Sequence, residues 1–163
     1  MNKENVKLFF EEYIGGKSTD FFSLAQSGSA RQNFVGTTST GKFIITYNEN
    51  LAENESFYYF SKIFSALKLN SPQIFKISED RKLYVQEFLG ENTLSEIIEK
   101  EGLSDRVKSL VKQTLTKLFE LQTKTENQID YSKTFEYENY DNLPITNDLF
   151  YFKSFIADVL EIP

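Results

Sequence analysis

The stretch LAQSGSARQNFVGTTSTGKFIITYN, residues 24–48, joins a loop of small residues to a strand-forming run and determines the fold that we predict. Its first part, residues 26–30, is small and polar, and Arg31 follows directly. Its last part, residues 43–47, consists of the β-branched and aromatic residues that favour strands. A small-residue loop between strands lets backbone N–H groups approach a phosphate closely. An ordinary hairpin turn rich in Gly and Ser has the same composition, so the loop alone leaves both interpretations open.

The composition of the chain excludes several classes of function. The sequence has 163 residues, of which 40% are hydrophobic, so it can form a sizeable core. Lys and Arg number 18 against 24 Asp and Glu, and this net charge of -6 disfavours nucleic-acid binding, which needs cations to neutralise phosphates. Because the sequence has no His and no Cys, it cannot form a histidine general base, a disulfide or a metal site ligated by either residue.

The sequence also carries no signal for export or for a membrane. Residues 1–16 contain scattered charges and no apolar run with the length of a signal peptide. No window approaches the roughly 20 apolar residues that a membrane span needs. We therefore expect a cytoplasmic protein without a membrane partner.

Around the opening stretch, the spacing of apolar residues predicts helices and strands in a definite order. Helices are expected over residues 2–14, 51–69, 93–100, 104–124 and from Asn147 onward. Strands are expected over residues 21–26, 32–38, 42–48, 73–78 and 82–89. Since strands this close in sequence pair antiparallel, the order predicts an α+β fold: a five-stranded antiparallel sheet with one packed helix, followed by further helices.

The helix expected over residues 51–69 should cover one face of that sheet. Its apolar residues recur at helical spacing, at Phe57, Phe60, Phe64 and Leu67. Their expected partners on the strands are Ile44, Ile45, Ile74, Ile77, Leu83 and Val85. Both patterns require a buried partner face, so we expect this stripe to pack directly on the sheet.

Four motifs, in this order, resemble the N-terminal lobe of the protein-kinase-like fold, and within it the aminoglycoside phosphotransferase family. They are QSGSARQNFVG (residues 26–36), KFIITYN (42–48), ESFYYFSKIFSALKLNSPQIFKI (55–77) and LYVQEFLGENTLSEII (83–98). The similarity is closest to the bacterial branch of kinases that phosphorylate N-acetylmuramate and N-acetylglucosamine at the anomeric carbon. The resemblance covers roughly residues 18–124.

The resemblance implies a nucleotide site at the small-residue loop and at the hinge that follows the fifth strand. The loop residues Ser27, Gly28 and Ser29 would approach the phosphates of ATP, and Arg31 would add a positive charge. The hinge would bind adenine through the backbone of Glu87 and Leu89. A strand that simply ends at a glycine is the alternative interpretation of this hinge.

The third strand departs from the kinase pattern, because it offers Thr46 or Tyr47 where kinases place a lysine for the phosphates. We interpret Lys42, at the start of that run, as a solvated turn residue. Glu53, the helix acid that would pair with such a lysine, is interpreted as a first-turn acid stabilised by the helix dipole.

The resemblance further implies a catalytic aspartate and metal-binding Asn and Asp residues in a second lobe. The segments SDR (residues 104–106) and YDN (140–142) do not reproduce that pattern, so we expect no catalytic or metal-binding residue in this chain. Mg²⁺ would accompany ATP through ligands in a lobe beyond Pro163, and the chain alone would be inactive. The expected divisions are an N-terminal helix (1–17), the kinase-like sheet and helix (18–90), post-hinge helices (91–124) and an irregular segment with a last helix (125–163).

Two functional hypotheses from different classes follow. In the first, the chain is the ATP-binding lobe of a phosphotransferase that transfers the γ-phosphate to a small hydroxylated acceptor such as an amino sugar. In the second, it is a free-standing interaction or regulatory module that uses no nucleotide. Residues 104–163 also carry more apolar side chains than one packed face requires, so we expect a homodimer formed through this segment.

Overall fold

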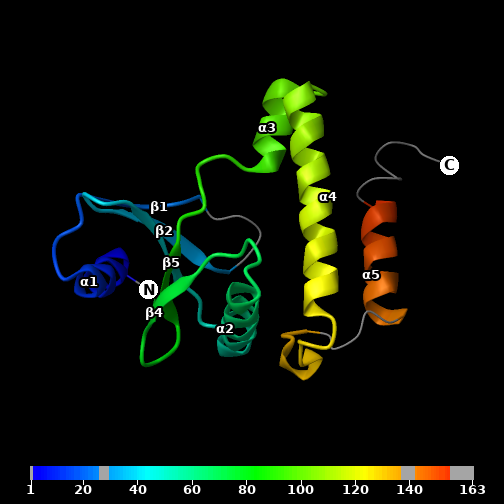
Figure 1. The fold of residues 1–163 in the computed structure, drawn as a ribbon. Coiled ribbons are helices and arrows are strands. Elements are labelled where there is room, and N and C mark those ends of the chain that lie inside the picture. The colour runs from blue at the N-terminus through cyan, green and yellow to red at the C-terminus, as the bar shows by residue number, and fades with distance from the viewer. Residues whose placement is uncertain (1, 26–29, 137–141, 155–163) are drawn as a thin grey trace. The chain divides into compact units, whose positions relative to one another are not determined.

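The computed structural model describes residues 2–25, 30–136 and 142–154. Five antiparallel strands form its sheet, in the order β1-β2-β3-β5-β4 (Figure 1). They are β1 (Asp20–Ser23), β2 (Gln32–Thr37), β3 (Lys42–Tyr47), β4 (Ile74–Ile77) and β5 (Leu83–Glu87). The predicted α+β class and five-stranded antiparallel sheet are therefore confirmed.

Helix α1 (Lys3–Ile14) covers one face of the sheet and forms the main hydrophobic core with it. Its Val6 and Phe10 are fully buried. Their buried partners on the strands are Phe21, Phe34, Ile45, Tyr47, Leu83 and Val85. Gly36 permits this close packing, because a Cβ atom at that position would lie 2.3 Å from the ring of Phe10.

A carboxylate fixes the segment that leaves α1. Glu11 accepts hydrogen bonds from the Lys17 ammonium at 2.8 Å and from the Ser18 N–H and hydroxyl at 3.1 Å each. These bonds, with that of Lys17 the largest cause, lower the pKa of Glu11 to about 2. The ionised carboxylate thereby ties the connection between α1 and β1 to the helix.

Helix α2 (Leu51–Ala66) packs on the opposite face, where Phe57 and Tyr58 both contact the ring of Tyr84 at centroid distances of 5.3 Å. The face that it buries differs from the predicted stripe. Its buried residues are Asn54, Tyr58 and Ser61, whereas the predicted Phe57, Phe60, Phe64 and Leu67 are only half-buried.

Backbone carbonyls just after β3 and in the turn between β4 and β5 explain this difference. The Asn54 amide donates to the backbone carbonyls of Asn48 and Arg81 at 2.9 and 3.0 Å, and the Tyr58 hydroxyl donates to the Arg81 carbonyl at 3.0 Å. Since buried backbone carbonyls need donors, polar side chains occupy the centre of the interface and displace the apolar stripe to its flank. Three of the predicted sheet partners, Ile45, Leu83 and Val85, lie in the core beneath α1.

Helices α3 (Leu94–Glu101) and α4 (Asp105–Thr125) follow the sheet and contact each other. Thr93 and Glu96 form a reciprocal capping box at the start of α3, and the Ser104 hydroxyl caps α4. None of the described helices is long and apolar enough to cross a membrane.

The chain divides into two compact units, residues 1–129 and 130–163. The second unit contains the 3-10 turn η1 (Tyr131–Lys133) and helix α5 (Asn142–Phe152). Helix α5 begins before the predicted Asn147, and Pro144 falls in its first turn, where a missing N–H leaves no helical hydrogen bond unmade.

Candidate functional site

The sheet face that carries α2 presents ordered rows of side chains, because alternate residues of a strand project to the same face. The first row is Phe22, Val35, Ile44 and Gln86. The second row is Asn33, Thr46 and Tyr84. Two residues further along their strands come Arg31 and Asn48. This face therefore changes from mainly apolar at one end to polar and charged at the other.

A pocket of about 550 Å³ lies at the apolar end of this face. Its lining includes the first row, Leu24 just after β1, and residues 86–91, which are the end of β5 and the segment that follows it. Both predicted hinge residues, Glu87 and Leu89, lie in this lining. Strands distant in sequence thus bring together an apolar floor and the segment predicted to be the hinge.

The segment after β5 has backbone groups available to a ligand. The Glu87 N–H donates to the Gln73 carbonyl at 2.9 Å, and its carboxylate accepts from the Gln73 N–H at 3.2 Å. These bonds fix Glu87 to the chain just before β4. Leu89, by contrast, is 65% exposed, and its N–H makes no hydrogen bond to the residues that the structure describes. Gly90 follows with a φ of 137°, a left-handed conformation that disfavours other residues.

Arg31 lies at the charged end of the same face. Its Nη2 is 2.7 Å from Glu53 Oε1 on α2, and both side chains are about one quarter exposed (26% and 25%). The guanidinium carbon lies 5.5 Å from the centre of the Phe57 ring. The Asn48 amide donates to the other Glu53 oxygen at 2.8 Å. Glu53 is thus a first-turn acid of α2, as predicted, but the prediction missed its pairing with the Arg31 cation.

The other predicted loop residues, Ser27, Gly28 and Ser29, lie outside the described residues. The loop that contains them joins Leu24, in the pocket lining, to Arg31. In the sequence, residues 26–29 therefore lie between the pocket lining and the Arg31–Glu53 ion pair.

Thr46 lies on this face, at one of the two third-strand positions where kinases place a lysine for the phosphates. Tyr47, the other position, belongs to the core on the α1 side. The Thr46 hydroxyl donates to Asn33 Oδ1 at 2.8 Å and accepts from Gln86 Nε2 at 3.2 Å. Burial raises the pKa of the neighbouring Tyr84 phenol, which therefore stays neutral. These side chains form a neutral polar network between the pocket and the ion pair.

Lys42 begins β3 and lines the rim of the pocket, so its interpretation as a solvated turn residue was incomplete. Its ammonium is paired with the Glu91 carboxylate and lies 5.5 Å from the centre of the Phe88 ring. The bond from Lys42 lowers the pKa of Glu91. Lys42 therefore ties the start of β3 to the segment after β5.

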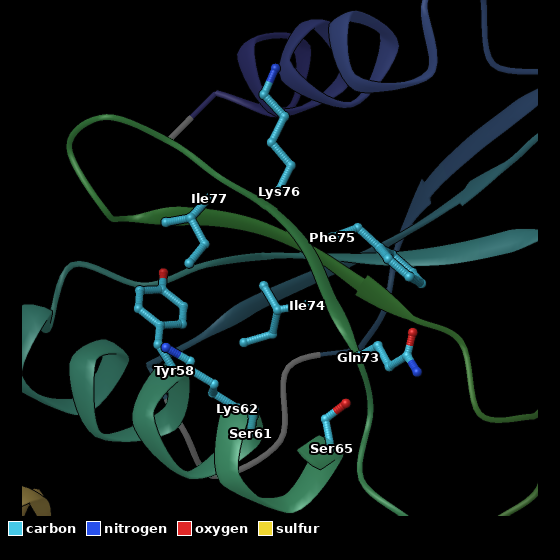
Figure 2. Close-up of a pocket in the computed structure, with 9 residues that line it drawn as sticks. All are labelled: Tyr58, Ser61, Lys62, Ser65, Gln73, Ile74, Phe75, Lys76 and Ile77. Carbon is cyan, nitrogen blue, oxygen red and sulfur yellow. The ribbon is translucent and has the colours of Figure 1, made fainter. Parts of the chain in front are cut away.

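A second pocket, of about 570 Å³, lies between α2 and the edge strand β4 (Figure 2). Its lining includes Tyr58, Ser61, Lys62 and Ser65 from α2 and residues 73–77. In Figure 2, Ile74 and Ile77 point toward α2, whereas Lys76 points away toward α1, where it pairs with Glu12 at 3.0 Å. This pocket contains none of the predicted site residues.

The predicted hinge residues Glu87 and Leu89 both line one pocket. The sequence did not predict the Arg31–Glu53 pair or the Asn33–Thr46–Gln86 network. The alternation of strand residues would have placed Arg31, Asn33 and Val35 on one face. Among the described residues, no three His, Cys, Asp or Glu side chains form a group that could hold a metal ion. Neither protein-family models nor curated protein sequences matched this chain.

Proposed function

We propose that this chain is the nucleotide-binding lobe of an ATP-dependent phosphotransferase whose acceptor is a small hydroxylated molecule such as an amino sugar. One observation carries the proposal: an apolar pocket with an available backbone N–H at Leu89 lies on the same sheet face as the Arg31 cation. A nucleotide has the matching order of parts, with a flat base at one end and phosphates at the other. The pocket also has the usual volume of a small-molecule site, about 300–1,000 Å³.

In this arrangement the base lies on Val35 and Ile44 and meets the backbone of Glu87 and Leu89. The triphosphate runs past Thr46 toward Arg31, and the loop residues Ser27, Gly28 and Ser29 cover it through their backbone N–H groups. The Arg31–Glu53 pair supports the phosphate end, because it supplies from the start of β2 the cation that the third strand lacks. Because the proposed ligand is ATP, we propose that this lobe works in the cytoplasm.

Mg²⁺ prefers carboxylate and other oxygen ligands, and no three acidic side chains in the described part of the chain form a group that could hold it. Near the pocket, the Glu87, Glu91 and Glu96 carboxylates bond to the Gln73 N–H, Lys42 and Thr93. No step is therefore assigned to a metal on these residues. In this proposal the lobe binds and orients the nucleotide, and we expect that it does not transfer phosphate without a second lobe.

A thermal-shift measurement with ADP and ATP, each with Mg²⁺, tests this function. A ligand that binds only the folded chain, present at 100 times its Kd, stabilises it by about 2.7 kcal/mol. For a chain of this size that corresponds to about 5–10 °C in Tm. Tripolyphosphate and adenosine are the matched partial ligands, and each is expected to give a smaller shift. Equal shifts with tripolyphosphate and ADP, or none with either nucleotide, would refute the proposal.

The exposed face of α4 favours the second candidate, an interaction module. Leu115, Leu118 and Phe119 are each at least half-exposed, and exposed apolar patches on proteins often mark interaction sites. The same thermal-shift experiment separates the candidates, because an interaction module without a nucleotide site gives no shift with ADP.

A further inference from the structure

The pocket of about 570 Å³ between α2 and β4 is an open groove beside a sheet edge (Figure 2). Among the described strands, β4 pairs with β5 alone and so ends the sheet. Ile74 and Ile77 point from β4 toward α2, and both are half-buried. Gln73, Phe75 and, on α2, Ser65 are exposed, so solvent reaches the groove. A molecule placed there meets an apolar wall next to an open strand.

Backbone hydrogen bonds show which groups of β4 face the open edge. The Ser78 N–H donates to a β5 carbonyl at 2.8 Å, and the Gln73 carbonyl accepts from a β5 N–H at 2.9 Å. Because successive residues direct their backbone groups to opposite edges, the neighbouring Ile74 and Ile77 direct theirs outward. A register shift between Ile74 and Lys76 brings the two isoleucine side chains to the same face. The residues that line the groove thus also offer donors and acceptors at the edge.

The charges around the groove favour an acidic partner. In the part of the chain that the structure describes, its lining includes Lys62 and Lys76 and no Asp or Glu, although acidic residues outnumber basic ones 24 to 18 in the sequence. Lys62 is exposed and makes no ion pair with the described residues. Lys76 pairs at 3.0 Å with Glu12, whose side chain is 75% exposed, so another carboxylate can replace it.

A second copy of β4 does not suit this edge. Pairing of two β4 strands would bring the Lys76 side chains of both copies to one face of the joined sheet, and like charges at that position are unfavourable. Lysine on an edge strand is a common protection against such self-pairing. An extended segment of alternating apolar and acidic residues suits it better, because its apolar side chains enter the groove and its acidic ones lie on the Lys76 face.

We propose that the edge of β4 binds an extended acidic segment of a partner protein, which adds a strand antiparallel to β4. In this mode of recognition, backbone hydrogen bonds supply affinity and pockets for alternate side chains supply specificity. A residue hydrogen-bonded to Ile77 in an antiparallel pair has its side chain on the same face, inside the groove. The apolar residues of the segment therefore bind β4 through their N–H groups. This interaction is independent of the proposed nucleotide site.

Amide NMR of the isotope-labelled full chain with synthetic peptides, about twice the length of the four-residue β4, tests the proposal. One peptide alternates Glu with Ile, and its matched counterpart alternates Lys with Ile. We expect the glutamate peptide to bind saturably with a Kd of about 1 mM or tighter, at least about fivefold tighter than the lysine peptide. Shifts are expected at residues 58–65 and 73–78. No saturable binding, shifts only elsewhere, or equal binding of both peptides would overturn the proposal.

Two N-methylated forms of the glutamate peptide test the contact with the strand edge. Methylation of the isoleucine amides removes the N–H groups that bond to β4 and is expected to weaken binding at least about tenfold. Methylation of the glutamate amides, which face away from β4, is the matched control and is expected to weaken it about threefold or less. Equal effects of the two methylations would overturn the pairing with β4.

A charge reversal in the groove tests the choice of an acidic partner. Lys62→Glu is expected to lower the preference for the glutamate peptide to about twofold or less at low ionic strength, where charges about 10 Å or more apart still interact. Lys112→Glu makes the same change at an exposed position of α4 outside the groove and is expected to keep the preference. An unchanged preference in Lys62→Glu, or an equal loss in both variants, would overturn the selection of acidic segments by this groove.

Discussion

Replacing Arg31 by Ala tests the phosphate end of the site, with Lys42→Ala as the comparison. Arg31 belongs to the small-residue motif and pairs with Glu53 on the sheet face that carries α2. Lys42 lies at the exposed rim, where it pairs with Glu91. If Arg31 serves the phosphates, its removal weakens nucleotide binding more than the removal of Lys42.

The magnitude follows from the surroundings of each cation. A hydrogen bond between charged groups contributes about 1.5–3 kcal/mol, so the loss of an Arg31–phosphate bond is expected to weaken ADP binding about 10- to 100-fold. An exposed pair such as Lys42–Glu91 contributes about 0.2–1 kcal/mol, which limits the effect of Lys42→Ala to about fivefold.

Arg81→Ala is the control for effects on folding. Arg81 also pairs with a glutamate of α2, Glu55, and its guanidinium carbon lies 5.0 Å from the centre of the Tyr58 ring. It therefore repeats the contacts of Arg31 outside the pocket. Calorimetric titration with ADP gives the affinities, and urea denaturation gives the stability of each variant. Equal loss of affinity in Arg31→Ala and Lys42→Ala, or an equal loss in Arg81→Ala, would remove Arg31 from the phosphate site.

Three further changes test the fold and the association of the chain. Gly36→Ala is expected to destabilise the chain by about 1–3 kcal/mol in urea denaturation, because the added Cβ would meet the Phe10 ring. Gly41→Ala is the control, since open space surrounds that position. Equal denaturation midpoints for the two variants would contradict the packing of α1. The pKa of Glu11 is lowered to about 2, so its contribution to stability is present above the unfolded-state pKa and is lost as the pH falls toward 2. Glu11→Gln should therefore flatten the dependence of the free energy of unfolding on pH over that range. An unchanged dependence would argue against the hydrogen bonds of Glu11. The chain is expected to be a homodimer through residues 104–163, so Phe119→Glu should shift light-scattering masses toward the monomer, and a monomeric wild type at high concentration would refute this.

The sequence was sufficient to predict the order of the elements, because local periodicity determines each of them. The strands and helices lie close to the predicted ranges, and the Thr93–Glu96 spacing correctly marks the start of α3. Chain proximity also predicts the antiparallel pairing of the strands. These features depend on residues that are near one another in the chain.

The errors concern contacts between residues that are distant in the chain. The buried face of α2 could not be predicted from its apolar stripe, because Asn54 and Tyr58 are buried where they donate hydrogen bonds to the carbonyls of Asn48 and Arg81. The partner of Glu53 was sought on the third strand, but its cation comes from Arg31, just before the second. The need of backbone carbonyls for hydrogen-bond donors determines the buried face of α2, and the strand register determines the partner of Glu53. Neither can be predicted from the spacing of apolar residues.

The most direct test of the proposed nucleotide site is a titration of the isotope-labelled chain with ADP, followed by amide NMR shifts. The two pockets lie on different parts of the sheet, so the pattern of shifts identifies the one that binds. We expect saturable shifts at residues 87–90 and at Val35 and Ile44, with residues 61–65 of α2 unchanged. Saturable shifts confined to the pocket between α2 and β4, or no saturable shift at all, would contradict the account.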